Sequence, residues 1–258
     1  MFVKISLKAN YMEVNLEFLA KDKENLLQAI KIIEKRIIKK NRKTLNPYQI
    51  SNDIKTILIQ KKENFSNNTL TKIRQFHDFY GWMSKGSLID VGLCSGAFYR
   101  TIEFINIDPV LRSGSKHDRK LEYGIHIEHT IPVASIRSVL FNNVNEQTSP
   151  KEIFNMILAY SVCTGFSRIN ERTNIIKGYN SKHPQISDGK LLLPNEIKPF
   201  MRYNKNTVIY SILSGNTVSL DSDLVSINSH LKEFGIFNWE FLECNCAETM
   251  NSATSNIN

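Results

Sequence analysis

Hydrophobic residues in the N-terminal part of the chain recur at three- and four-residue steps, the spacing of one helix face. The positions within residues 22–41 that share this face are Leu26, Leu27, Ile30, Ile33 and Ile37. Asn46-Pro47 interrupts the pattern. We therefore expect a second helix over residues 48–62, and a third from about residue 66 to Gly81 or Gly86.

The pattern changes at residue 87, where glycine, aromatic and β-branched residues replace the helical spacing. Short strands and turns are expected there, including strands over residues 124–133 and 160–166. Ser149-Pro150 predicts the start of a helix that runs to Ala159, because proline favours the first helical turn. Gly215-Asn216 predicts a β-hairpin. Helices followed by mixed short elements indicate an α+β fold.

Charge adds a candidate partner to this picture. The 258 residues include 33 lysines and arginines against 25 aspartates and glutamates, a formal charge of +8. Such a balance favours nucleic acid, although a lysine- and asparagine-rich composition alone gives the same charge. The densest positive segment of the middle chain is residues 112–120, and its candidate DNA contacts are Arg112, Lys116, Arg119 and Lys120.

Several classes of protein are disfavoured by composition. The four cysteines are too few and too scattered for a disulfide framework, which favours a reduced, cytoplasmic protein. No run approaches the ~18 apolar residues of a membrane-spanning helix. The glycines form neither a GxxxxGKS/T nor a GxGxxG motif, so a phosphate-cradling loop of either kind is not expected.

The candidate chemistry lies in "GIHIEHTIPV", residues 124–133, which contains His126, Glu128 and His129 just before Pro132. A carboxylate binds a hard divalent cation such as Mg²⁺ through oxygen. An imidazole, which titrates near neutral pH, acts as a general base. Phosphodiester hydrolysis needs both functions. The alternative is a surface strand whose polar side chains face solvent.

The stretch "IEHTIPV" resembles the first segment of the HNH, or ββα-metal, nuclease motif, in which an acidic residue and a histidine precede a proline as Asp/Glu-His-x-x-Pro. The order of "LIDVGLCSGAFYR", "IHIEHTIPV" and "PFMRY" is similar to that in HNH-type restriction endonucleases. The resemblance covers about residues 85–205. It implies a β-hairpin followed by a helix, wrapped around one divalent ion.

The resemblance also implies roles for individual residues. His129 matches the general base that activates water, and Glu128 matches the acidic metal ligand beside it. The second ligand of the family lies on the helix after the second strand, where Asn170 fits best. The other residues that fit this second position are Glu171, Asn174 and His183. The segment between the two key parts, residues 132–159, is longer than in the usual hairpin.

Three further side chains have two readings each. Arg202, in "PFMRY", either binds phosphate and stabilises the leaving group, or is buried and pairs with a carboxylate. Arg168, near the expected helix start, has the same two readings. His126 shares a strand face with Glu128, so it either binds a metal or phosphate or makes a structural hydrogen bond.

The expected function is a Mg²⁺-dependent HNH endonuclease of double-stranded DNA, with Mn²⁺ as a substitute ion, and most simply a type II restriction enzyme that acts as a homodimer. The expected regions are a helical part for DNA binding or dimerisation (1–86), the HNH-like core (87–205), a β-rich extension (206–247) and a flexible tail (248–258). The alternatives are a non-catalytic DNA-binding regulator and a hydrolase of small substrates, which needs an enclosed apolar pocket.

Overall fold

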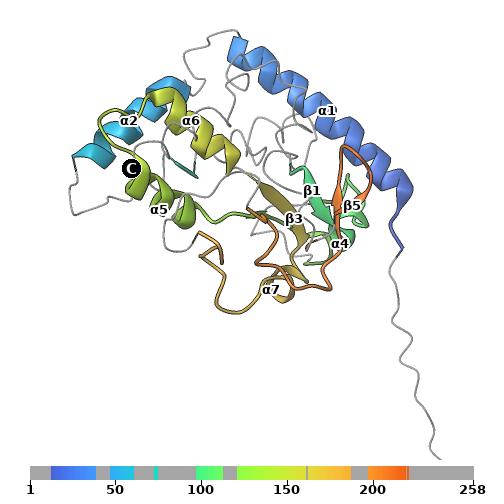
Figure 1. The fold of residues 1–258 in the computed structure, drawn as a ribbon. Coiled ribbons are helices and arrows are strands. Elements are labelled where there is room, and N and C mark those ends of the chain that lie inside the picture. Colours follow the sequence, from blue (N-terminus) through green and yellow to red (C-terminus); the bar gives the residue numbers. More distant parts are fainter. Residues whose placement is uncertain are drawn as a thin grey trace, which may run out of the picture.

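The structure is a computed structural model that describes residues 13–38, 47–60, 73–74, 97–112, 121–160, 162–186, 197–218 and 220. These residues form helices and a mixed five-stranded sheet, which confirms the expected α+β class (Figure 1). The expectations for most of the third helix, for the last strand and tail, and for Lys116, Arg119 and Lys120 lie outside the described residues.

The sheet joins strands that lie far apart in the sequence. Its strands are β1 (Tyr99–Thr101), β2 (Ile125–His129), β3 (Cys163–Ser167), β4 (Ile209–Ser211) and β5 (Thr217–Val218). The order across the sheet is β2-β3-β1-β4-β5, so β2 is at one edge of the sheet that the described residues form. β1 and β3 run parallel, and the other neighbours are antiparallel. The sheet therefore crosses the expected boundary after residue 205.

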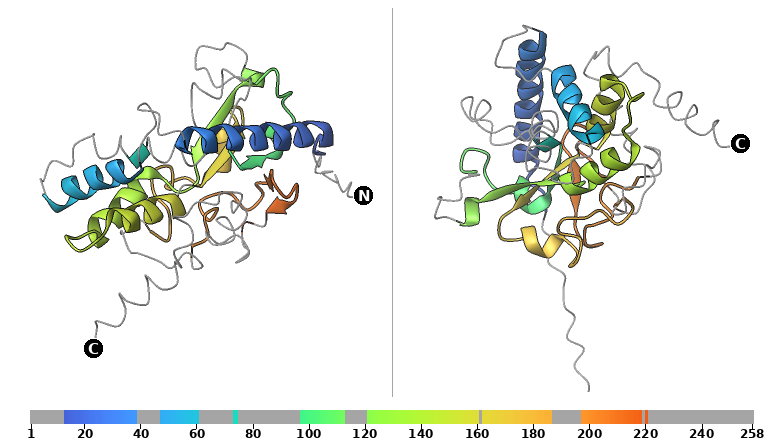
Figure 2. Two further views of the ribbon diagram at one scale, coloured as in Figure 1. Left: turned by 90° about the horizontal axis from the view of Figure 1, so that it is seen from above. Right: turned by 90° about the vertical axis from the view of Figure 1, so that its left-hand side faces the viewer.

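Helices cover the sheet and extend to one side of it. The helical segments are α1 (Leu16–Ile38), α2 (Pro47–Ile59), α4 (Ile102–Ile105), the 3-10 turn η2 (Leu121–Tyr123), α5 (Val133–Asn143), α6 (Pro150–Ala159) and α7 (Glu171–Asn174). α2, α5 and α6 gather on one side of the molecule, and α1 runs past the sheet on the other (Figures 1 and 2). Of the described helices, none has both the length and the apolar character that crossing a bilayer requires.

Local sequence signals explain several element boundaries. α1 begins at Leu16, earlier than expected, because the Asn15 side chain accepts a hydrogen bond from the backbone N–H of Phe18 at 3.1 Å. α6 spans the predicted residues, and Ser149 and Glu152 form a reciprocal capping box at its start. The predicted hairpin is confirmed as β4 and β5, which Gly215 joins at φ +73°.

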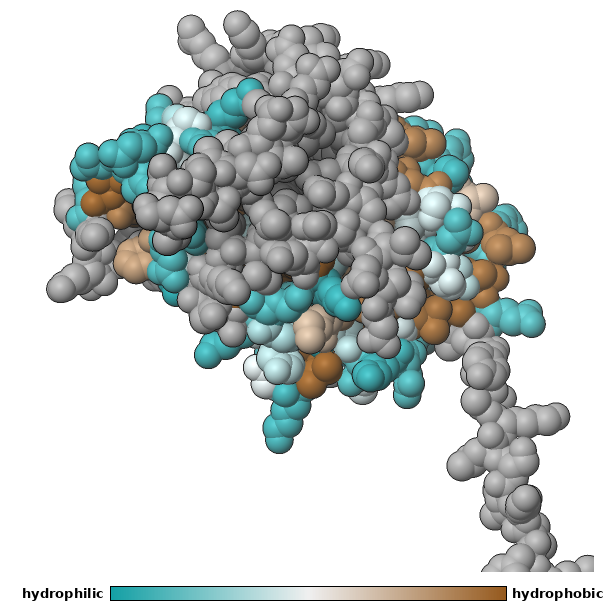
Figure 3. All heavy atoms as spheres, viewed as in Figure 1, coloured by the Kyte–Doolittle hydropathy of each residue, from teal (hydrophilic) through white to brown (hydrophobic). Residues whose placement is uncertain are grey.

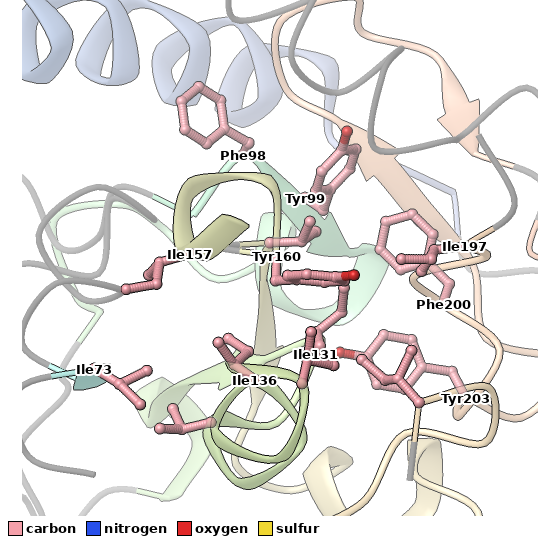
Figure 4. Close-up of a cluster of buried hydrophobic side chains, with 14 of the residues drawn as sticks. Ile73, Phe98, Tyr99, Ile131, Ile136, Ile157, Tyr160, Ile197, Phe200 and Tyr203 are labelled. Carbon is pink, nitrogen blue, oxygen red and sulfur yellow. The ribbon is translucent and has the colours of Figure 1, made fainter. Parts of the chain in front are cut away.

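The core is aromatic where the sheet meets the loop before β4. Tyr99 and Phe200 pack edge to face with ring centroids 4.9 Å apart, and Phe166 and Tyr203 do the same at 5.2 Å. Figure 4 shows Tyr160 and Ile131 beside the rings of Tyr99, Phe200 and Tyr203. The described surface below the sheet, around α7, is mostly hydrophilic (Figure 3). The loop that contains Arg202 is thus anchored in the core next to β2.

Candidate functional site

β2 places the side chains of "HIEH" on two faces of the sheet. Glu128 pairs in register with Thr164 of β3, which pairs in turn with Tyr99 of β1. Directly paired residues share a face, and successive residues alternate. His126 and Glu128 therefore lie on the face of Tyr99 and the aromatic core. His129, the last residue of β2, lies on the opposite face, at the edge of the sheet that the described residues form.

Arg202 binds the last two residues of β2 through its guanidinium group. Its side chain is 0% exposed, and its Nη2 lies 2.8 Å from Oε1 of Glu128. Its Nη1 donates to the backbone carbonyl of His129 at 2.8 Å. Nη2 also donates to the carbonyl of Asn180 at 3.1 Å. Of the two readings of Arg202 that the sequence left open, the structure shows the buried arginine paired with a carboxylate. The phosphate contact has no exposed guanidinium to make it in this structure.

The second oxygen of Glu128 faces an imidazole. Nε2 of His126 lies 3.1 Å from Oε2 of Glu128. The side chain of His126 is 37% exposed and that of Glu128 is 15% exposed, so this pair reaches solvent. Burial alone would raise the pKa of Glu128, but the hydrogen bond from His126 and the charge of Arg202 outweigh it and hold that pKa below its ordinary value. Glu128 is therefore a carboxylate at neutral pH.

His183 supports the loop that carries Arg202. Its side chain is buried, and its Nε2 donates to the carbonyls of Lys198 and Pro199 at 3.1 and 3.3 Å. Its Nδ1 accepts from the backbone N–H of Gln185 at 3.3 Å, which fixes a neutral tautomer. Burial lowers the pKa of His183 to about 4. His183 is therefore a neutral structural residue of a loop, and the structure gives it no place beside Glu128.

Tyr203 closes the base of the cluster. Its ring is buried against Phe166, and its hydroxyl lies near Thr130 and Thr164, whose own hydroxyl oxygens are 2.8 Å apart. The Tyr203 hydroxyl makes no well-formed hydrogen bond within the described residues. Burial raises the pKa of Tyr203 well above its ordinary value. Tyr203 is thus a buried, neutral side chain that packs beside the cluster.

Asn170 does not join this cluster. It follows Ser167, which pairs with Ile125 at the start of β2, about 10 Å along the strand from Glu128 at ~3.4 Å per residue. The backbone carbonyl of Asn170 accepts from Nδ2 of Asn174 at 2.7 Å. Oδ1 of Asn174 accepts from Thr207 at 3.0 Å. Asn170 therefore lies beyond the start of β2, away from Glu128, and the side chain of Asn174 is bound to Asn170 and Thr207.

The described residues contain no group of three His, Cys, Asp or Glu side chains that could hold a metal ion. The side chain of Glu171, another candidate for the second ligand, lies outside the described residues.

Arg112 points into the protein instead of toward DNA. Its guanidinium pairs with both carboxylate oxygens of Asp22 and donates to the carbonyls of Ile107 and Ile105 at 3.0 and 3.1 Å. The side chain is 2% exposed. Arg100 pairs with the same Asp22 at 2.8 Å. The structure thus gives Arg112 a buried partner, Asp22, in place of the exposed position that the expected DNA contact needs.

Arg168 is partly buried and faces β2. Its Nε donates to the carbonyl of Ile125 at 3.2 Å, and its backbone N–H donates to the carbonyl of Gly124 at 2.8 Å. Arg168 thus fastens the start of β2 to the end of β3. These bonds favour a structural role for Arg168 over the phosphate contact.

Comparisons with known proteins give no indication of the function of the chain. No family model, curated protein or solved structure matches the chain. What the structure supplies is an ionised carboxylate between a buried arginine and an exposed imidazole, with a second histidine next to it at the edge of the sheet.

Proposed function

We propose that the chain is a metal-dependent endonuclease that hydrolyses phosphodiester bonds in double-stranded DNA. The observation that carries the proposal is Glu128, which is ionised, partly exposed and held between Arg202 and His126 next to His129. Among the described strands, none pairs with the outer side of β2, next to this group. The resemblance of "IEHTIPV" to an HNH segment and the net charge of +8 support the same reading.

Glu128 suits a hard divalent ion. Mg²⁺ keeps several waters and is commonly bound by one or two carboxylates together with substrate phosphates. Glu128 could serve as such a carboxylate ligand. Its hydrogen bond to His126 lies at the solvent boundary, where an ion could replace the imidazole. Such an ion, when bound, supplies charge neutralisation on the phosphate.

His129 is the proposed general base. A ring nitrogen of His129 accepts a proton from the attacking water, whose oxygen forms the new bond to phosphorus. The bond from phosphorus to the 3′ oxygen breaks, and that oxygen takes a proton from solvent. His129 and Glu128 lie on opposite faces of the sheet, but β2 is the outermost of the described strands, so a backbone phosphate that lay along this edge would meet both faces.

A finer proposal follows from the symmetry of DNA. Each active site cuts one strand, so a sequence-specific enzyme of type II would act as a homodimer on a palindrome. The basic segment with Lys116, Arg119 and Lys120 remains the proposed DNA contact on the sequence alone.

The second candidate is a non-catalytic DNA-binding protein. It is favoured by one observation, namely that both oxygens of Glu128 already have protein partners in the structure. In that case the cluster only fastens the edge strand to the loop that carries Arg202. Such a protein would bind DNA whether or not His129 is present.

Plasmid cleavage separates the two candidates. The wild-type protein is incubated with DNA in Mg²⁺, in Mn²⁺ and in EDTA, beside His129→Ala and a control, Lys177→Ala, at an exposed position. We expect cleavage that needs the metal, that falls by about 10²–10⁴-fold in His129→Ala, and that persists in Lys177→Ala. A gel-shift without cleavage on several DNAs would support the binding protein instead.

A further inference from the structure

We propose that Arg202 is a positioning residue that sets the relative placement of Glu128 and His129 and does not touch DNA. The proposal rests on the proposed function, since it concerns the same two residues. Its basis is one fully buried guanidinium that bonds to the side chain of the first residue and to the backbone of the next.

The first argument is the geometry of the guanidinium. Its donors lie in one rigid plane, so two bonds from the same group fix two acceptors relative to each other. Nη2 is bound to Oε1 of Glu128 and Nη1 to the carbonyl of His129, both at 2.8 Å. With Oε1 held, Oε2 of Glu128 is left facing His126 and solvent. A lysine ammonium is a single point charge and cannot keep both bonds in this arrangement.

The second argument is that Arg202 itself has little freedom to move. Its Nη2 also donates to Asn180, from the loop before His183. His183 binds the carbonyls of Lys198 and Pro199 at the start of the Arg202 loop, and the next residue, Tyr203, packs against Phe166. The guanidinium group is therefore held in one position, from which it binds the last two residues of β2.

Burial excludes a direct role in substrate binding. The Arg202 side chain is 0% exposed, whereas His126, on the other side of Glu128, is 37% exposed. Substrate therefore meets His126, Glu128 and His129, and the effect of Arg202 passes through them. The competing explanation is that Arg202 only stabilises the fold, as a buried ion pair would anywhere else.

The experiment compares Arg202→Lys and Arg202→Ala with a control, Arg100→Lys, which alters another buried arginine that pairs with a carboxylate. Folding is checked by circular dichroism, and kcat and KM for metal-dependent DNA cleavage are measured per folded molecule. Loss of a residue that orients metal ligands commonly lowers activity by about 10–100-fold. We expect that loss in kcat of Arg202→Lys with KM nearly unchanged, partial rescue of Arg202→Ala by guanidinium ion, and wild-type kcat in Arg100→Lys.

Two results would overturn the proposal: wild-type kcat in folded Arg202→Lys, or an equal loss of kcat in Arg100→Lys. Histidine ring signals in NMR spectra separate this failure from failure of the proposed function. If the wild type cleaves no DNA, the nuclease proposal fails. Signals of His126 and His129 that move in Arg202→Lys and not in Arg100→Lys would then still show that Arg202 positions them, and unmoved signals would refute it.

Discussion

Two buried arginine–carboxylate clusters lie on opposite faces of the same sheet. In the first, Asp22 sits between Arg100 and Arg112, and all three side chains are at most 2% exposed. In the second, Glu128 sits between the buried Arg202 and His126, whose side chain is 37% exposed. Arg100 and Glu128 lie on opposite faces because Arg100 pairs with Gly165 and Glu128 pairs with the preceding residue, Thr164.

The difference between the clusters lies in the third partner. A second guanidinium seals Asp22 from water and cannot give up a proton at any ordinary pH. An imidazole instead leaves Glu128 at the solvent boundary, beside a side chain that is 37% exposed. An arginine–carboxylate pair therefore supports structure on one face of the sheet, and on the other face it leaves a carboxylate at the solvent boundary, where the proposed metal ion would bind.

The cluster of Asp22, Arg100 and Arg112, here called the sealed cluster, is expected to contribute more to the free energy of unfolding than the cluster of Glu128, Arg202 and His126, here called the open cluster. Asp22→Asn leaves two buried guanidinium groups without a counter-charge, and breaking a buried pair in this way costs about 3–5 kcal/mol. Urea unfolding measures this loss directly. Lys21→Ala is the matched control on the same helix, because it removes an exposed ion pair with Glu24 that contributes at most about 1 kcal/mol. Equal midpoints for the two variants would show that the cluster adds nothing specific.

The loop that contains His183, next to the open cluster, is expected to make the stability of the protein depend on pH. His183 has an ordinary pKa of 6.5 and a pKa of about 4 when folded, so the unfolded chain takes up its proton first. Stability contributed by neutral His183 is thus complete above pH 6.5 and is lost as pH falls toward 4, by an amount on the order of 3 kcal/mol.

His183→Gln tests this effect, since a glutamine amide can still donate to a backbone carbonyl and has no proton to gain. The unfolding free energy of the variant should fall less steeply between pH 6.5 and 4 than that of the wild type. Parallel curves would mean that His183 is not held neutral in the folded protein.

A smaller loss of stability is expected from a substitution at Gly165 of β3, next to the sealed cluster. A Cβ at Gly165 would lie 2.8 Å from Cε2 of Phe104, the ring on which the guanidinium groups of Arg100 and Arg112 stack at 5.1 and 4.7 Å. Gly165→Ala should therefore destabilise the protein by about 1–3 kcal/mol through overpacking. Adding Phe104→Leu should recover part of the loss in a double-mutant cycle, and purely additive losses would exclude this contact as the cause.

Local parts of the fold could be predicted from the sequence, because their causes lie within a few residues. The start of α6 follows from Ser149, Pro150 and Glu152, and the hairpin follows from Gly215. The parallel pairing of β1 with β3 has no such local signal, because it depends on a crossover of some 60 residues. The sheet order could therefore not be read from periodicity.

The site was predicted in part for the same reason. His126, Glu128, His129 and Arg202 were singled out, but only the fold shows that Arg202 is buried beneath β2. Asp22 was missed, although it lies on the apolar face of α1 between Leu19 and Leu26. A charged residue at a core position of a helix predicts a buried partner. Its partners Arg100 and Arg112 are 78 and 90 positions away (100 − 22 and 112 − 22), beyond the reach of local patterns.

The most direct test of the central claim is the DNA cleavage rate per folded molecule of Glu128→Gln beside that of Asp22→Asn, in Mg²⁺. Both substitutions replace a carboxylate that pairs with arginine by an amide of the same shape, one in each cluster. The predicted result is a loss of at least about 100-fold in Glu128→Gln and a wild-type rate in Asp22→Asn. A wild-type rate in Glu128→Gln would contradict the claim and leave both clusters as structural pairs.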